Sequence, residues 1–373
     1  MMSARDDDFD AGSKVSRGDL ESLLNRFADA SDIFLKQDTY PVAKVFGRNR
    51  LVMNRRLQQN EMRQLLTAAY KDNVNGYDMV MGKARSLDFV YEGLDGQRFR
   101  VAVARDMQSE TAGPSATFRR IKPEPWTLAE ADAPEDLVYV SRTQRSGLIL
   151  VTGPTGSGKS ATLSSLLRDH VERPDSSCIL RTIEDPVEFV YGRVAAPTAV
   201  IDQMQVGSSV ESFSDGIRAH LRMAPTHMLV GEVRDAETAQ AAIWAAQSGH
   251  LVYATMHPNT IPELFDYWSK FFPQAMRAVM IYNLATTLKY VVCQHLVPTV
   301  DGKRVAVREC LDFTRLGSAG SVAQEIASNS ERVFQLMREK VNLYGRPMRQ
   351  SALELIERGR VRQEDVITYL MTG

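Results

Sequence analysis

The eight residues Gly153 to Ser160 read GPTGSGKS, and this stretch decides the fold class of the chain. It fills every fixed position of the pattern G-x-x-x-x-G-K-[ST], in which glycines let backbone N–H groups converge on phosphates. A short apolar run rich in β-branched residues precedes it at 148–152, and residues 161–168 after it have a helical composition. Strand, glycine loop and helix are the context that the pattern requires. The stretch therefore predicts an α/β domain that binds a nucleoside triphosphate.

Within this loop Lys159 is expected to reach the β- and γ-phosphates, and the Ser160 hydroxyl is expected to ligate Mg²⁺. The predicted nucleotide contacts are Gly153, Pro154, Thr155, Gly156, Ser157, Gly158, Lys159, Ser160 and Ala161.

Composition limits what else the chain can be. Its 373 residues suffice for about two domains, and 44% hydrophobic residues supply a core. A formal net charge of −1 argues against a whole-molecule nucleic-acid binder. The three cysteines are far apart in apolar stretches, as expected of buried side chains in a reducing cytoplasm. No run approaches the roughly 18 apolar residues of a membrane span, and the acidic residues 6–8 are unlike a signal peptide, so we expect a soluble protein that is not exported.

Periodicity divides the chain into a disordered tail at 1–17, a small α+β domain at 18–122, a linker at 123–136 and an ATPase domain with a C-terminal helical part at 137–373. The first domain has two amphipathic helix patterns, at 20–27 and about 58–71, and strand patterns at 31–35, 87–91 and 99–104. Four prolines between 111 and 136 place the connection there, together with the strand-like residues 116–118. Alternating strands and helices after it predict a mostly parallel sheet covered on both faces.

Three chemically active side chains follow predicted strands of this sheet. Glu184 ends the run at 178–183, Glu232 follows 228–231, and His257 follows 251–255. Ligands of open α/β sheets collect at the carboxyl ends of strands. We therefore expect Glu184 to polarise the attacking water, Glu232 to act on Mg²⁺ as a Walker B acid, and His257 to sense the γ-phosphate.

Other histidines and four arginines have less defined roles. His250, at the start of the third strand, is either a capping or packing residue or part of the site, while His170, His220, His227 and His295 are expected to be structural or exposed. Guanidinium groups supplied in trans can stabilise phosphoryl transfer. Arg98, Arg100, Arg105 and Arg119 in the first domain are candidates for this role, and a charged strand face is the alternative.

The four ordered motifs at 153–160, 182–189 (aspartate box), 230–235 (Walker B) and 249–257 (histidine box) resemble the secretion ATPases of the PilT type. The chain is most similar to the DotB branch of type IVB secretion systems and its conjugative-plasmid counterpart TraJ, supported by residues 31–33, 188–191 and 294–309. An Ala-Ile-Arg-Asn-Leu-Ile segment typical of pilus-retraction members is absent from 310–373, which argues against that role.

The resemblance implies a PAS-like N-terminal domain and a RecA-like ATPase domain, assembled as a homohexamer that hydrolyses ATP with Mg²⁺. It implies that Glu184 activates water, that Glu232 is the Walker B acid and that the four arginines approach phosphates. Its implied partners are inner-membrane components of a secretion or conjugation machine, with the protein cytoplasmic and not inserted in the membrane. The alternatives are a pilus-retraction ATPase, a RecA-like nucleic-acid motor and a nucleotide-binding scaffold without turnover.

Overall fold

The structure of the chain is a computed structural model that describes residues 14–45, 48–70, 76–82, 86–106, 113–317, 319–328 and 332–371. The chain divides into two compact units, Met1–Pro123 and Glu124–Gly373. Most of the predicted tail, residues 1–13, lies outside the described residues, as does the end of the predicted helix at residue 71.

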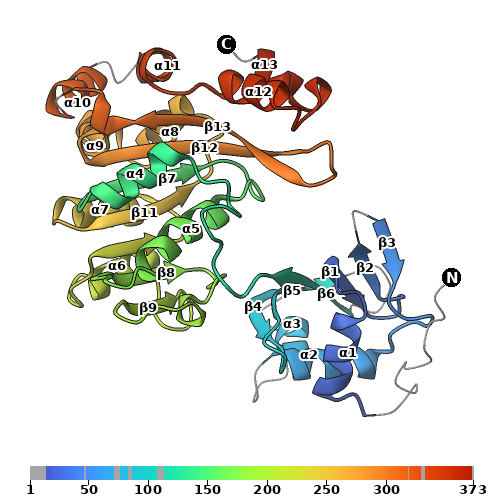
Figure 1. Cartoon of the computed structure of the whole chain (residues 1–373). Coiled ribbons are helices and arrows are strands. Elements are labelled where there is room, and N and C mark those ends of the chain that lie inside the picture. The colour runs from blue at the N-terminus through green and yellow to red at the C-terminus, as the bar shows by residue number, and fades with distance from the viewer. Residues whose placement is uncertain are drawn as a thin grey trace. The chain divides into compact units, whose positions relative to one another are not determined.

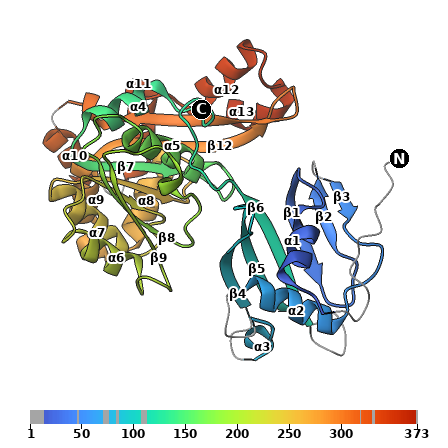
Figure 2. The same cartoon turned by 60° about the horizontal axis from the view of Figure 1, so that its bottom comes forward.

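The first unit is an antiparallel six-stranded sheet with helices on one side (Figures 1 and 2). The spatial order is β3-β2-β1-β6-β5-β4. Its apolar side chains pack between the sheet and the helices, with Leu20, Leu65 and Phe118 fully buried. The elements are α1 (Arg17–Asn25), β1 (Ala30–Lys36), β2 (Val42–Val45), β3 (Arg48–Leu51), α2 (Gln59–Ala69), α3 (Gly76–Met81), β4 (Ser86–Glu92), β5 (Arg98–Asp106) and β6 (Gly113–Ile121).

The second unit is built on a seven-stranded sheet with the order β13-β12-β7-β11-β10-β8-β9. All neighbouring pairs are parallel except β12 with β13, so the sheet is mostly parallel with one antiparallel edge. The strands are β7 (Gly147–Thr152), β8 (Ile179–Glu184), β9 (Val200–Gln205), β10 (His227–Val230), β11 (Leu251–Met256), β12 (Leu288–Pro298) and β13 (Arg304–Asp312).

Helices cover both faces of this sheet, as expected for buried parallel strands. Helices α4 and α5 pack on one face against Ile149 and Tyr253, while α6 to α9 pack on the other against Leu148 and Leu150. The helices are α4 (Glu135–Thr143), α5 (Lys159–Val171), α6 (Phe213–His220), α7 (Ala236–Gln247), α8 (Ile261–Lys270), α9 (Gln274–Thr287), α10 (Ala319–Ser328), α11 (Val333–Tyr344), α12 (Met348–Glu357) and α13 (Ile367–Met371), with 3-10 turns at Tyr191–Arg193, Phe313–Arg315 and Gln363–Val366.

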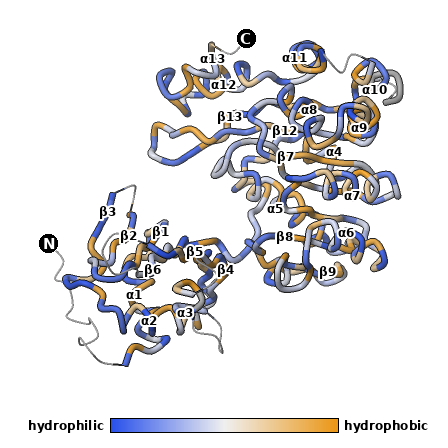
Figure 3. Tube along the Cα trace, turned by 180° about the vertical axis from the view of Figure 1, so that it is seen from behind, coloured by the Kyte–Doolittle hydropathy of each residue, from blue (hydrophilic) through white to orange (hydrophobic). Residues whose placement is uncertain are grey.

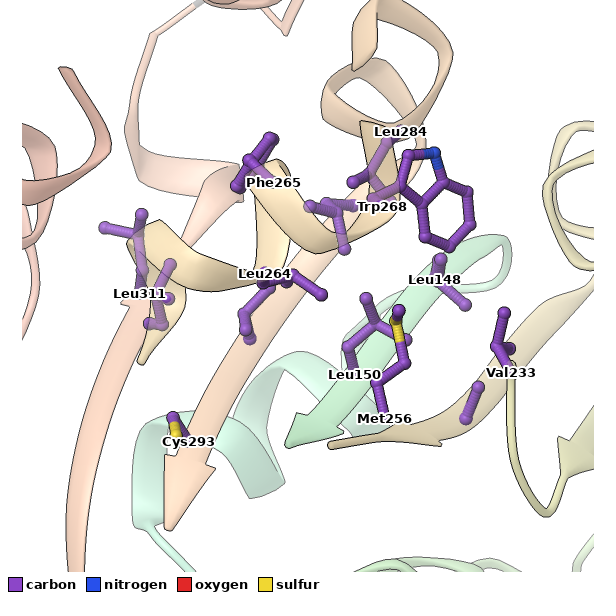
Figure 4. Close-up of a cluster of buried hydrophobic side chains, with 14 of the residues drawn as sticks. Leu148, Leu150, Val233, Met256, Leu264, Phe265, Trp268, Leu284, Cys293 and Leu311 are labelled. Atoms are coloured by element: carbon purple, nitrogen blue, oxygen red, sulfur yellow. The ribbon is translucent and has the colours of Figure 1, made fainter. Parts of the chain in front are cut away.

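The core of the second unit follows from the apolar composition of its central strands. Every residue of β7 and β11 is buried, and Figure 3 colours β7 largely as apolar. Figure 4 shows Leu148 of β7 beneath the indole of Trp268 in α8, with Leu150 beside Met256 of β11. Leu148 and Leu150 of β7 therefore face one layer of helices, while Ile149 and Val151 between and after them face the other. The expected α/β class, with a smaller domain before the main sheet, is confirmed.

One expectation about the connection between the units needs correction. Residues 116–118, placed in the linker by the prolines around them, form the middle of β6 and pair with both β1 and β5. Pro114 is the second residue of this strand, at its amino end, where a missing N–H costs little, so the proline did not exclude strand pairing. The strands β9, β12 and β13 were not among those predicted.

Candidate functional site

Strand register gathers the loops that follow β7, β8, β10 and β11 at one edge of the sheet. Thr152 of β7 pairs with Met256 of β11, so Gly153 and His257 leave the sheet side by side. Val230 of β10 pairs with Ile183 of β8, which places Glu184 beside the residues that follow β10. Two backbone bonds extend these pairings, from Gly231 N–H to Ile183 O (2.8 Å) and from Val233 N–H to Thr255 O (3.0 Å).

The glycine loop between β7 and α5 has the backbone that its sequence requires. Gly153, Gly156 and Gly158 have φ of 136°, 80° and 86°, a region that residues with a Cβ rarely adopt. At Gly153 a Cβ would collide with the backbone carbonyl oxygen of Gln294. The loop leads directly into the first turn of α5, where unpaired N–H groups and the helix dipole favour an anion.

Lys159, the first residue of α5, is turned onto its own loop. Its Nζ donates to Gly153 O at 2.7 Å and to Pro154 O at 3.0 Å, and the residue is 9% exposed. Burial lowers the pKa of Lys159, while the nearby Glu232 carboxylate opposes that shift. The following residue, Ser160, is exposed.

Glu232 and His257 face each other across the ends of β10 and β11. His257 Nε2 lies 3.1 Å from Glu232 Oε1, and both side chains keep a substantial exposed fraction. The adjacent Thr255 hydroxyl donates to Gly231 O and ties the two strands together below this pair. The site thus presents an acid and an imidazole side by side near Lys159.

Glu184 has a different environment, because it ends β8 inside the fold. Its carboxylate accepts from the Thr182 hydroxyl at 2.6 Å, from Gln203 Nε2 at 3.2 Å and from the Glu188 N–H at 3.4 Å. Burial raises the pKa of Glu184 to about 7, against the effect of these donors. This carboxyl can therefore change protonation state near neutral pH.

The residues at this edge suit a nucleotide with its metal ion. Ser157 Oγ is buried without a hydrogen-bond partner among the described residues, within a loop that leaves no room for a Cβ at Gly153 and little at Gly158. No group of three or more His, Cys, Asp or Glu side chains in the described part of the chain forms a metal cage. A hydroxyl, a carboxylate and phosphate oxygens are what Mg²⁺ takes in phosphoryl-transfer sites, so Ser160 and Glu232 fit it.

Comparison with known proteins decides the family. The model of the family described as "Type II/IV secretion system protein" matches residues 99–367. The chain belongs to this family. It is 34% identical over 289 residues to the type IV pilus retraction ATPase PilT of Pseudomonas aeruginosa, covering 76% of this chain and 78% of that protein. The type IV pilus ATPase PilU of the same organism is 29% identical over 94% of this chain and 88% of its own length.

Solved structures of the type II/IV secretion system family share the fold over nearly the whole chain. The ATPase DotB of Legionella pneumophila superposes with a TM-score of 0.82 and 29% identity, covering 98% of this chain and 99% of that one. The pilus retraction motor PilT with bound ADP superposes with a TM-score of 0.78 and 28% identity, over 94% and 96% of the two chains. The chain is an ATPase of this secretion and pilus class.

The four candidate arginines of this secretion ATPase all lie in the first unit, where each contacts a neighbour. Arg98 is buried with its Nε 3.5 Å from Glu92, and Arg100 pairs with Asp88 at 2.8 Å. Arg119 pairs with Asp32 at 2.7 Å, and Arg105 NH1 lies 3.5 Å from Met81 O. The side chain of Arg119 is 62% exposed and that of Arg98 only 7%, so they differ in availability to a ligand.

The other histidines lie away from the phosphate edge or have structural contacts. His250 lies at the amino end of β11 with Nδ1 2.9 Å from Ala245 O, the last turn of α7, so it takes the capping alternative. The rings of His170 and His227 lie with their centroids 4.2 Å apart and their planes tilted by 42°. His170 is buried and His227 half-buried, while His220 is fully buried. His295 is partly exposed, with Nε2 3.1 Å from Asn259 O.

Sequence reasoning missed two residues of the site. Glu188 of the aspartate box is close enough to Lys159 to oppose the lowering of that lysine's pKa by burial. Gln294 of β12 is fully buried and donates from Nε2 to Ser157 O in the glycine loop at 2.8 Å. The available signal was a polar pair, Gln294 and His295, inside an otherwise apolar strand. No helix in the described part of the chain is long and apolar enough to cross a membrane.

Proposed function

We propose that this secretion ATPase binds ATP with Mg²⁺ at the loop edge of its parallel sheet and hydrolyses it there. The observation that carries the proposal is the register of β7, β8, β10 and β11, because it brings Lys159, Glu184, Glu232 and His257 from separated motifs to one edge. A nucleotide fold alone would need only the glycine loop. The converging acids and imidazole supply what hydrolysis adds to binding.

The roles follow from chemistry and exposure. Residues 153–161 hold the phosphates through backbone N–H groups, and Lys159 exchanges its contacts with loop carbonyls for β- and γ-phosphate oxygens. Mg²⁺, held by Ser160 and Glu232, neutralises charge on the phosphates when bound. The Glu184 carboxylate accepts the proton of the attacking water, and His257 contacts the γ-phosphate through the Nε2 that now faces Glu232.

The arginines of the first unit act in trans, on phosphates bound by a neighbouring subunit. Arg105 and Arg119 have the more exposed guanidinium groups and are favoured over Arg98 and Arg100 for this role. Since Arg119 is paired with Asp32, it must leave that carboxylate to reach a phosphate. Loss of such a finger lowers turnover by about a thousandfold or more in enzymes that use one.

At the level of the machine, we propose a cytoplasmic homohexamer that powers a type IVB secretion or conjugative transfer apparatus through inner-membrane partners. Support comes from the likeness to Legionella DotB, which extends over 98% of this chain and therefore includes the first unit. The second candidate is pilus retraction, favoured by the 34% identity to PilT. Hydrolysis drives domain movements in either case, and the attached machine determines their use.

Turnover and mass test the enzymatic part. We expect the purified full chain to hydrolyse ATP as a six-subunit particle, with Lys159→Ala abolishing turnover. Lys270→Ala is the matched control, because Lys270 is an exposed lysine that pairs with Asp266 on the same helix α8. Turnover that persists in Lys159→Ala, or a wild-type particle that binds no ATP, contradicts the assignment of this loop.

The choice of machine needs a cellular test. Replacement of the chromosomal gene by Glu184→Gln should stop effector or plasmid transfer and leave twitching motility unchanged if the secretion role is correct. Loss of twitching with intact transfer would assign the chain to pilus retraction.

A further inference from the structure

A buried polar network starts at the glycine loop and ends in the first segment of the second unit. Its first member is Gln294 of β12. Its Nε2 donates to Ser157 O at 2.8 Å, and its Oε1 accepts from the Thr162 hydroxyl of α5 at 3.0 Å. The backbone carbonyl of the same residue limits position 153 to glycine. Gln294 therefore touches the loop at its start, near its end and in the helix that follows.

The second member is Arg308, directly opposite Gln294 in the antiparallel β12–β13 pair. Arg308 Nε donates to Gln294 Oε1 at 3.4 Å, and Arg308 NH2 donates to Ala131 O at 2.9 Å. Asp132 Oδ2 lies 3.9 Å from Arg308 NH1 and 3.3 Å from Arg360 NH1. Since Arg308 is 6% exposed, its guanidinium is held by these groups and not by bulk water.

Residues 125–132, which include the Ala131 carbonyl bonded by Arg308, also form hydrogen bonds with α5, the helix that follows the glycine loop. Arg168 NH1 of α5 donates to Pro125 O at 2.7 Å, and Trp126 N–H donates to Ser164 Oγ at 3.3 Å. Asp132 has a φ of 48°, in the left-handed region that few residues other than glycine, asparagine and aspartate adopt. In the chain, this segment immediately follows Pro123, where the first unit ends.

We infer that Gln294 and Arg308 are positioning residues: Gln294 sets the conformation of the glycine loop, and Arg308 couples that conformation to residues 125–132. The inference rests on the proposed function of the loop as the phosphate site. A phosphate that draws Lys159 away from Gly153 O and Pro154 O changes the loop backbone next to Ser157 O. The change moves Gln294 through its hydrogen bond to Ser157 O. The planar guanidinium of Arg308, which is bonded to both Gln294 and Ala131 O, then shifts the position of Ala131.

The two positions make different predictions for the full-length protein. Gln294→Glu keeps the size and the acceptor to Thr162 and Arg308 but loses the donor to Ser157 O. We expect ATP affinity to fall by about tenfold or more, as for loss of a buried donor with its acceptor left unsatisfied. Arg308→Met leaves the Gln294–Ser157 bond in place, so ATP affinity should stay within about threefold.

Hydrogen exchange measures the coupling itself. In the wild type, the imido analogue of ATP should slow exchange at residues 153–162 and also at 125–133. In Arg308→Met it should still slow exchange at 153–162 but no longer at 125–133. Arg308→Lys, which keeps the buried charge without the planar fork, should behave like Arg308→Met. Gln324→Glu, at an exposed position of α10, and Arg346→Met, which removes an ion pair with Glu354, are the matched controls.

The outcomes separate this inference from the proposed function. A wild type that binds no analogue rejects the nucleotide site. A wild type that binds it, with no change of exchange at 125–133, overturns the coupling while the site stands. Loss of affinity in Arg308→Met equal to that in Gln294→Glu also overturns it, since both residues would then act only on the loop. Selective loss of the signal at 125–133 supports it, with thermal melting to show that each variant is folded.

Discussion

His257 Nε2 lies 3.1 Å from Glu232 Oε1, although 25 residues of chain separate the two side chains. The contact exists because β10 and β11 are parallel neighbours, with Val230 opposite Ala254, so the residues that follow both pairing positions lie side by side. An acid suited to a metal ion and an imidazole suited to a phosphate are thereby adjacent. Because His257 and His250 lie at opposite ends of the same strand, replacing each in turn gives the first prediction.

Replacement of His257 by alanine should lower kcat by about ten- to a hundredfold with little change in ATP affinity, because a γ-phosphate contact acts mainly in the transition state. His250→Ala is the matched control, since it changes the opposite end of the same strand. Steady-state kinetics and equilibrium binding of both variants provide the measurement. Equal losses of kcat in the two variants would remove His257 from the site.

The pH dependence of turnover should reveal Glu184. Its pKa of about 7 means that the ionised form needed to accept a proton is lost as pH falls below neutral. Wild-type kcat should therefore rise between about pH 6 and pH 8. Thr182→Val removes a donor that favours the ionised form, so the rise should move to higher pH. Both profiles are measured at saturating ATP. If kcat of Thr182→Val rises at the same pH as in the wild type, the rise reports the ionisation of another group.

Two glycines of the loop should respond differently to alanine. At Gly153 a Cβ collides with the Gln294 carbonyl, so Gly153→Ala should abolish nucleotide binding. At Gly156 nothing lies within 4 Å of a Cβ, so Gly156→Ala carries only the backbone cost of positive φ, about 1 kcal/mol. Calorimetric titration with ATP compares them. Tight ATP binding by Gly153→Ala would contradict the prediction and would show that the backbone of β12 can move away from the added Cβ.

The adjacent His170 and His227, buried and half-buried, predict acid lability. Burial lowers the pKa of His170 to about 4 and that of His227 to about 3, below the unfolded value near 6.5. The unfolded chain therefore binds more protons in this range, and stability is present above about pH 6.5 and lost as pH falls. Each histidine should lower the free energy of unfolding by about 2 kcal/mol when the pH falls from 7 to 5.

Replacement of both histidines by phenylalanine should flatten this pH dependence, whatever it does to stability at pH 7. Thermal melting at pH 7 and pH 5 measures the difference. Burial raises the pKa of Glu184 and of Glu309 to about 7, which acts in the opposite direction but is common to both proteins. A variant with the wild-type dependence would place the acid lability elsewhere.

Local sequence predicted the elements around the glycine loop closely, because their signals are short-range. Asp235 caps α7 by accepting from the Thr238 N–H, and Gly249 ends it with a φ of 97°, both as the residue types indicate. The prolines around 116–118 favour a linker, whereas the strand forms because these residues pair with β1 and β5. Pairing of that kind depends on tertiary contacts, which propensity does not describe.

Residue type and spacing are enough to predict a phosphate-binding loop between a strand and a helix, with Glu184, Glu232 and His257 at strand ends. Which of these residues lie together, and in what surroundings, depends on how distant segments pack in the folded chain. The strand order put β11 beside β7, burial brought the pKa of Glu184 near neutrality, and the β12–β13 pair placed Gln294 and Arg308 behind the loop. Register and burial arise from the packing of distant segments, so no local pattern contains them.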